Sequence, residues 1–163
     1  MRKGQVTIEF LMLLLVMLLY VQAIVQPNME ITSSAATDVA NAGRGVAELS
    51  KFYNAVVDVG YSTGDAKSTV TLFMPPYSVL QCNSSQASVS IALSQALFSQ
   101  KVNNANCADE TDRQLCTKII PFPSDLTVAC NLKWPNSSAS ESTSAPPAKE
   151  ITIIKSGSTV TVS

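Results

Sequence analysis

The sequence predicts an α+β protein, with a long apolar helix at the N-terminus and a β-rich domain behind it. Residues 6–25 are almost entirely apolar, and as a helix such a stretch measures about 30 Å. Beyond residue 68, short runs of β-branched residues alternate with proline, glycine and serine, which is typical of strands and turns. Between these regions, apolar residues recur every three or four positions, which predicts that the helix continues to about residue 59.

Composition and charge limit what the chain can do. Its 163 residues suffice for one compact domain with a helical extension, and a net charge of −1 argues against nucleic-acid binding. The absence of histidine excludes Ser-His-Asp and Cys-His catalysis and removes the commonest zinc ligand. The sequence also lacks phosphate-binding and dinucleotide-binding glycine motifs and a nucleophile elbow. We expect no enzyme activity and no cofactor.

The N-terminal apolar stretch has the length and the flanking charges of a membrane-spanning helix. A helix of about 20 residues crosses the hydrocarbon core of a bilayer. Arg2 and Lys3 precede the stretch, so the positive-inside preference places the N-terminus in the cytoplasm and the rest of the chain outside. Glu9 lies near its start, and a carboxylate there costs several kcal/mol unless it finds a partner or reaches the interface. Its presence therefore indicates a function.

The residues around Glu9 resemble a known type of signal. The segment from Gly4 to Phe10 reads Gly-Gln-Val-Thr-Ile-Glu-Phe and continues into the apolar run. It resembles the class III signal peptide of type IV pilin-like proteins, especially archaeal pilins whose mature chain begins at glutamine. The glycine, glutamine, glutamate and apolar run all fall in register, while Thr7 stands where serine is more usual.

The resemblance implies a subunit of an extracellular filament used for surface adhesion. A prepilin peptidase would cut after Gly4, so that Gln5 starts the mature chain. Gln5, Glu9 and Phe10 would then act in assembly, with Glu9 facing the N-terminal amine of a neighbouring subunit. If Gln5 cyclises to pyroglutamate, Glu9 needs another donor or a proton. The implied partners are the peptidase, the pilus assembly machinery, the membrane before assembly, and further copies of the chain in a helical filament.

Two plainer interpretations stay open. Arg2, Lys3 and the apolar core also imitate a cleaved secretory signal, whose cleavage after Ala23 would release a chain that starts at Ile24. An uncleaved membrane anchor is the other interpretation. In both cases the protein would be a secreted or membrane-tethered binding module. Within the filament family, an archaellin and a minor pilin stay open as well.

The helix is expected to continue beyond the membrane, with a kink or local break at Pro27, because proline lacks an N–H and clashes with the preceding turn. An amphipathic stripe follows at helical spacing: Val39, Ala42, Val46, Leu49, Tyr53 and Val56. Gly43 and Gly45 weaken this part by about 1 kcal/mol each. Gly60 and the turn-forming residues 62–65 end it. We expect the second half of the helix to pack on the chain's own β-rich domain, as in a pilin.

The C-terminal part is predicted to consist mainly of strands. The candidate runs are Thr69–Met74, Ser88–Leu93, Leu126–Leu132, Glu150–Lys155 and Thr159–Val162. Ser156-Gly157 predicts a tight hairpin turn, and Gln95–Val102 a short helix. Residues 135–147 are rich in serine and proline and predict an exposed loop. The expected division is a leader over 1–4, a helix over 5–59 and an extracellular head over 60–163.

All four cysteines lie in the predicted head: Cys82, Cys107, Cys116 and Cys130. An even number without a Cys-x-x-Cys pair predicts disulfides in an exported domain, although the sequence leaves the connectivity open. We favour a nested arrangement, Cys107–Cys116 inside Cys82–Cys130, because the segment between Cys107 and Cys116 is short and polar. A zinc site of four thiolates is the alternative, but such sites normally contain a closely spaced pair.

The head also carries candidate modification sites. Asn83 and Asn136 each begin an Asn-x-Ser sequon, so both are candidate N-glycosylation sites. The acidic residues Asp109, Glu110 and Asp112 lack the spacing of a calcium loop, and we expect a solvated loop there rather than a metal site. The expected location is the cell surface, as a filament assembled from a membrane-inserted precursor.

Overall fold

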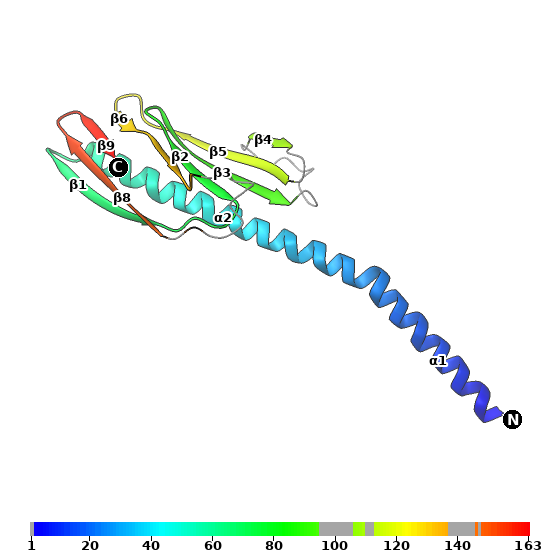
Figure 1. Cartoon of the computed structure of the whole chain (residues 1–163). Coiled ribbons are helices and arrows are strands. Elements are labelled where there is room, and N and C mark those ends of the chain that lie inside the picture. The colour runs from blue at the N-terminus through cyan, green and yellow to red at the C-terminus, as the bar shows by residue number, and fades with distance from the viewer. Residues whose placement is uncertain (1, 95–105, 110–112, 137–145, 147) are drawn as a thin grey trace. The chain divides into compact units, whose positions relative to one another are not determined.

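The structure is a computed structural model that describes residues 2–94, 106–109, 113–136, 146 and 148–163. Within these ranges the chain is helical from Arg2 to Tyr61 and then forms strands β1 to β9, so the predicted α+β class is confirmed (Figure 1). The chain divides into two compact units, Met1–Thr37 and Asp38–Ser163. The predicted short helix at Gln95–Val102 lies outside the described residues.

In the first unit, Pro27 changes the type of helix rather than ending it. The described part of this unit consists of α1 (Arg2–Tyr20), the π-helical turn η1 (Val21–Val25) and the beginning of α2 (Gln26–Tyr61). The N–H of Gln26 donates to the carbonyl of Val21. In a regular α-helix, a proline ring clashes with the carbonyl group of the residue four positions earlier. The wider π-helical turn relieves this clash for Pro27. The irregularity expected at Pro27 therefore lies in the turn before it.

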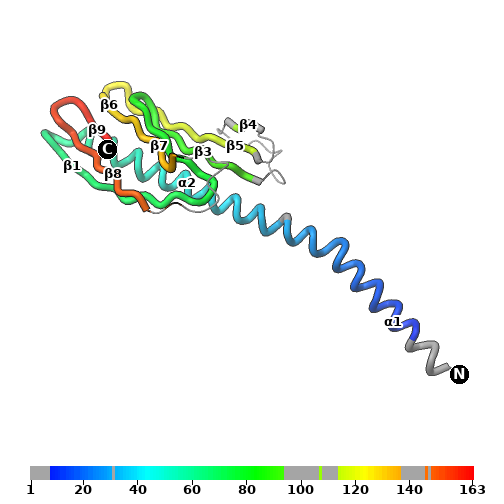
Figure 2. Tube along the Cα trace, viewed as in Figure 1, coloured from blue at the N-terminus to red at the C-terminus, as the bar shows by residue number. Residues whose placement is uncertain are grey.

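In the second unit, one face of α2 is buried against the strands, and Figure 2 traces this part of the helix alongside both sheets. The buried side chains of this face are Leu49, Phe52, Val56 and Val59. The predicted stripe is wrong at two positions, because Val39 is 60% exposed and Val46 is 37% exposed. The buried face runs through Gly45 and Phe52 instead. Hydrophobic patterning does not mark Gly45, because glycine has no side chain.

The strands form two sheets that share one hydrophobic core with α2. Sheet A has the order β1 (Ala66–Leu72), β8 (Lys149–Ser156), β9 (Thr159–Val162) and β6 (Thr127–Cys130). Its pairs are antiparallel except β6–β9. Sheet B is antiparallel, with the order β4 (Asn106–Asp109), β5 (Arg113–Pro121), β3 (Gln86–Ser94), β2 (Ser78–Cys82) and β7 (Leu132–Trp134). Leu72, Ile151 and Ile153 of sheet A meet Leu80 and Val89 of sheet B in this core.

Three of the five predicted strand runs lie wholly in strands, namely β3, β8 and β9, and the run Thr69–Met74 lies in β1 as far as Leu72, where that strand ends. The run Leu126–Leu132 is wrong as a single strand, because the chain passes from sheet A to sheet B at Asn131, between β6 and β7. Strands β2, β4 and β5 were not predicted. In β5, charged residues interrupt the alternation. Pro121 is nevertheless the last residue of this strand and lies beyond the stretch that pairs with β4, where β5 is an edge and a proline is tolerated.

The predicted tight turn before the last strand is confirmed. Ser156 pairs with Thr159, which leaves Gly157 and Ser158 as the two-residue turn. Gly157 has a φ of 62°, in the left-handed region that glycine enters without steric cost. Its N–H donates to Oδ1 of Asp65 over 3.1 Å, which ties the turn to the segment after α2.

Gly60 allows the end of α2 to approach the loop between β5 and β6. A Cβ at this position would lie 2.8 Å from Cδ2 of Leu126 and closer still to Cδ1. We expect Gly60→Ala to lower the free energy of unfolding by about 1–3 kcal/mol, because overpacking displaces Leu126. Gly43 is the matched control, since a Cβ there meets nothing within 4 Å among the described residues. Gly43→Ala should instead raise stability by about 1 kcal/mol through helix propensity. The measurement is chemical unfolding by denaturant. Free energies of unfolding that change in the same direction for both variants would contradict this prediction.

The hydroxyl group of Tyr61 ties the end of α2 to Asp125. Its O–H donates to that carboxylate, with 2.9 Å to Oδ2 and 3.1 Å to Oδ1. This hydrogen bond raises the pKa of Tyr61 above its ordinary value of 10.0, and the negative charge of Asp125 acts in the same direction.

Because the pKa of Tyr61 is higher in the folded state, the interaction stabilises the fold at neutral pH and is lost as the pH rises through the folded pKa. We expect the wild type to lose more thermal stability than Tyr61→Phe between about pH 9 and pH 12. The measurement is the melting temperature of both proteins across that range. Identical pH profiles would show that this hydrogen bond does not contribute.

Candidate assembly helix and head sites

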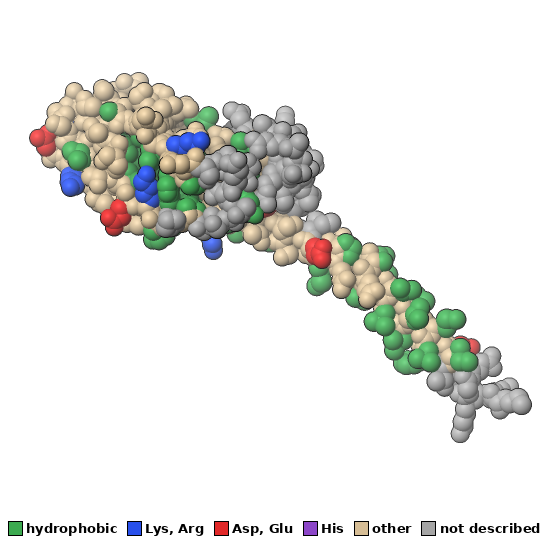
Figure 3. Space-filling model, viewed as in Figure 1, with side chains coloured by type: hydrophobic (Ala, Val, Ile, Leu, Met, Phe, Trp, Pro, Cys, Tyr) green, Lys and Arg blue, Asp and Glu red, His purple; other side chains and the backbone are tan. Residues whose placement is uncertain are grey.

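The apolar side chains of the first unit are exposed along the described length of the helix (Figure 3). Phe10 and Met12 are each 65% exposed, and no residue of η1 is buried. An apolar surface of this extent is typical of a contact with lipid or protein rather than with water. Among the described residues, one helix is long and apolar enough to cross a membrane, and its apolar part includes Ile8 and the residues that follow. This segment is therefore the candidate for contacts with lipid or with another protein.

Glu9 is the acidic residue at the start of this surface. Its side chain is exposed, and among the side chains that the structure describes, which begin at Ile8, no cationic group lies within salt-bridge distance of it. Gly4 and Gln5 lie in α1 as well, so Gln5 precedes Glu9 by about one helical turn. The residues predicted for processing and assembly are thus brought together on successive turns, and Glu9 offers a carboxylate among apolar neighbours.

Polar side chains further along this unit bond to their own helix. Asn28 Nδ2 donates to the carbonyl of Ile24 over 2.7 Å, Thr32 Oγ1 to that of Asn28 over 2.8 Å, and Thr37 Oγ1 to that of Ser33 over 3.0 Å. These donors are satisfied without water, which lowers the cost of burying the segment against lipid or another helix. These bonds were not predicted, although threonine in a helix interior is a known signal for them.

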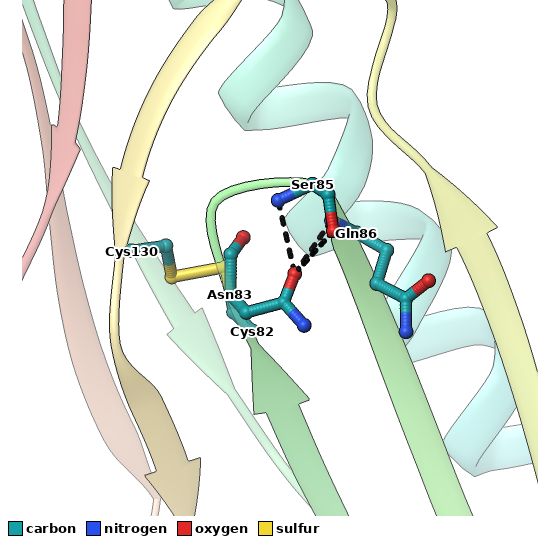
Figure 4. The surroundings of a disulfide bond; sticks show 5 residues. All are labelled: Cys82, Asn83, Ser85, Gln86 and Cys130. Atoms are coloured by element: carbon teal, nitrogen blue, oxygen red, sulfur yellow. Dashed lines mark hydrogen bonds between the residues drawn. A yellow bond between two sulfur atoms is a disulfide. The ribbon is translucent and has the colours of Figure 1, made fainter.

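Both predicted disulfides are formed in the head. Cys82 of β2 bonds to Cys130 of β6 and links sheet B to sheet A, as Figure 4 shows. Cys107 of β4 bonds to Cys116, its direct partner in β5. Because all four thiols are paired, the alternative zinc site does not form. The described residues contain no group of three or more histidine, cysteine or acidic residues that could hold a metal.

Of the two sequons, only the first lies wholly within the described residues. Asn83 and Ser85 lie in the turn between β2 and β3, and both are exposed. Asn136 is exposed just after β7, but the rest of its sequon lies outside the described residues, as do Glu110 and Asp112 of the acidic cluster.

No model of a known protein family matches this chain, and no curated protein and no solved structure matches it significantly. A long N-terminal helix that is apolar at its start and whose last part packs on a β-rich domain is nevertheless consistent with a pilin-like fold. The apolar helix and the two disulfides indicate a membrane or secreted protein, because disulfides persist in oxidising compartments outside the cytosol.

Proposed function

We propose that this chain is a structural subunit of an extracellular filament of the type IV pilus kind, assembled through its N-terminal helix. The observation that carries the proposal is the apolar helix surface, exposed from Ile8 to Ile24, on the same chain as a disulfide-bonded head. In the precursor, lipid covers this surface. In the filament, the same surface of neighbouring copies replaces the lipid. The head stays outside and serves adhesion, so the role is structural rather than catalytic.

Glu9 sets the register of assembly in this proposal. A prepilin peptidase removes residues 1–4 and creates an amine at Gln5, and the amine of one copy lies against Glu9 of the next. Opposite charges attract strongly in a medium of low dielectric, whereas an unpaired carboxylate costs several kcal/mol there. Arrangements that pair the two groups are therefore favoured over other registers. The assembly machinery moves the chain from the membrane into the filament.

The continuity of α2 favours a filament subunit over a membrane-tethered binding module. The helix runs from Gln26 to Tyr61, and its last part supplies Leu49, Phe52 and Val56 to the core of the head. A segment that only tethers a domain to the membrane needs enough length to connect the two, and it can be flexible. The last part of α2 instead belongs to the hydrophobic core of the head, as the second half of the helix does in a pilin.

The proposal is tested by the N-terminal peptide of the mature native protein, measured by mass spectrometry. We expect a chain that begins at Gln5, either free or cyclised, and that is recovered in filaments sheared from the cell surface. A chain that begins at Ile24 would indicate an ordinary secretory signal, and one that keeps Met1 would indicate an uncleaved anchor. Either of these two results would overturn the filament function.

A further inference from the structure

The turn between β2 and β3 carries chemistry that filament assembly does not use. Asn83, Ser84 and Ser85 connect the two strands and are all exposed. The N–H of Asn83 donates to the carbonyl of Gln86 over 3.0 Å and closes the turn. Cys82, the last residue of β2, is held by its disulfide to Cys130 (Figure 4). The turn is thus fixed at its base and open to solvent at its tip.

The side chain of Asn83 is held in one orientation by three hydrogen bonds. Its Oδ1 accepts from the N–H of Ser85, the hydroxyl of Ser85 and the N–H of Gln86, each over 2.9 Å (Figure 4). Because backbone N–H groups only donate, they identify the bonded atom as the oxygen and leave Nδ2 on the other side. Among the described residues, Nδ2 has no hydrogen-bond partner. A substituent on Nδ2 therefore breaks none of the bonds that close the turn.

A polar recess of about 310 Å³ lies beside the turn, and Asn83 is part of its lining. The other polar residues around it are Gln81, Gln86, Ser88, Asn131 and Lys133. Their amide, hydroxyl and ammonium groups supply both donors and acceptors, the combination that the hydroxyl groups of a sugar require. A sugar attached to Nδ2 of Asn83 starts at the rim of this recess.

We propose that Asn83 is N-glycosylated and that the first sugars of its glycan lie in this recess. Asn83-Ser84-Ser85 is an Asn-x-Ser acceptor sequence. The co-reactant is a glycan linked through pyrophosphate to a lipid. Nδ2 forms a bond to the anomeric carbon of the first sugar, the bond from that carbon to the pyrophosphate oxygen breaks, and the pyrophosphate leaves with the electron pair. Nδ2 loses one proton to a base of the transferase.

The attachment is tested by mass spectrometry of the Asn83 peptide from the mature protein, purified from its native cells. We expect a glycan mass on Asn83 that is lost in Ser85→Ala and retained in Ser84→Ala. Ser84 is the matched control, because the acceptor sequence tolerates any residue except proline at that position. An unmodified Asn83 in the native protein would overturn the proposal, as would a glycan that disappears with Ser84. The N-terminal peptide from the same digest tests the filament function independently.

The position of the sugars is tested by the reactivity of Lys133, which lines the recess. We expect an amine-reactive reagent to modify Lys133 more slowly in the glycosylated wild type than in Ser85→Ala, because the sugars shield its amine. Lys67 is the control, since it is exposed in β1 of the other sheet and should react equally in both proteins. Equal rates at Lys133 would overturn the placement of the glycan in the recess.

Discussion

Phe52→Ala is expected to lower the free energy of unfolding of the head by about 3–5 kcal/mol. Phe52 is fully buried and projects from α2 into the cluster where both sheets meet. Truncation removes the burial of an aromatic ring and leaves a cavity that two hydrogen-bonded sheets close only in part. The measurement is denaturant unfolding of the full chain in detergent, followed by the fluorescence of Trp134, which packs against the same cluster.

Val39→Ala is the matched control on the same helix. Val39 is 60% exposed in the structure, so its truncation should change the free energy of unfolding by no more than about 0.5 kcal/mol. The hydrophobic pattern of the sequence predicts the opposite, namely a larger loss of stability for Val39→Ala than for Phe52→Ala, because Val39 belongs to the predicted apolar stripe and Phe52 does not. Equal losses for the two variants would mean that α2 presents a different face to the sheets.

The features that the sequence predicted correctly have local signals. The apolar run predicts the helix, and Ser156-Gly157 predicts the hairpin turn. Runs of β-branched residues predict β1, β3, β8 and β9. The nested disulfides were favoured for a local reason too, because the segment between Cys107 and Cys116 is short and polar. In each of these cases except Cys82–Cys130, the residues that determine the structure are near one another in the chain. Cys82 and Cys130 are 48 residues apart, and they are the pair that is left once Cys107 and Cys116 are joined.

The features that the sequence did not predict depend on residues that are distant in the chain. The buried face of α2 includes Gly45 because a Cβ there would lie 2.7 Å from Cδ1 of Ile91 in β3. Similarly, the strand run that contains Asn131 divides because its two halves pair with different sheets.

The same distinction applies to the candidate sites. The motif around Glu9 is contiguous and was identified from the sequence. The recess beside Asn83 takes Gln81 from β2, Ser88 from β3 and Lys133 from β7, so only the fold brings its lining together.

Glu9→Ala is expected to abolish filaments while leaving the chain processed and inserted in the membrane. The substitution does not touch Gly4 or Gln5, and it lowers the cost of placing the helix in lipid because it removes a carboxylate from an apolar stretch. What it removes is the partner proposed for the amine of the neighbouring copy. Each 1.4 kcal/mol lost from a subunit contact weakens it about tenfold, and a filament repeats the contact at every subunit. The measurement compares filament yield with the amount of processed chain in the membrane.

Glu9→Gln separates the two ways in which Glu9 can act. The glutamine keeps the size of the side chain and one oxygen that accepts hydrogen bonds, but not the charge. If the partner is the free amine of Gln5, this variant should fail to assemble like Glu9→Ala, because the amine is left without a counter-charge. If Gln5 is cyclised, the amine is absent and Glu9 accepts a hydrogen bond from another donor. The side-chain oxygen of glutamine can accept the same bond, so Glu9→Gln should then assemble while Glu9→Ala still fails. Normal filaments from Glu9→Ala would contradict any role of this residue in assembly.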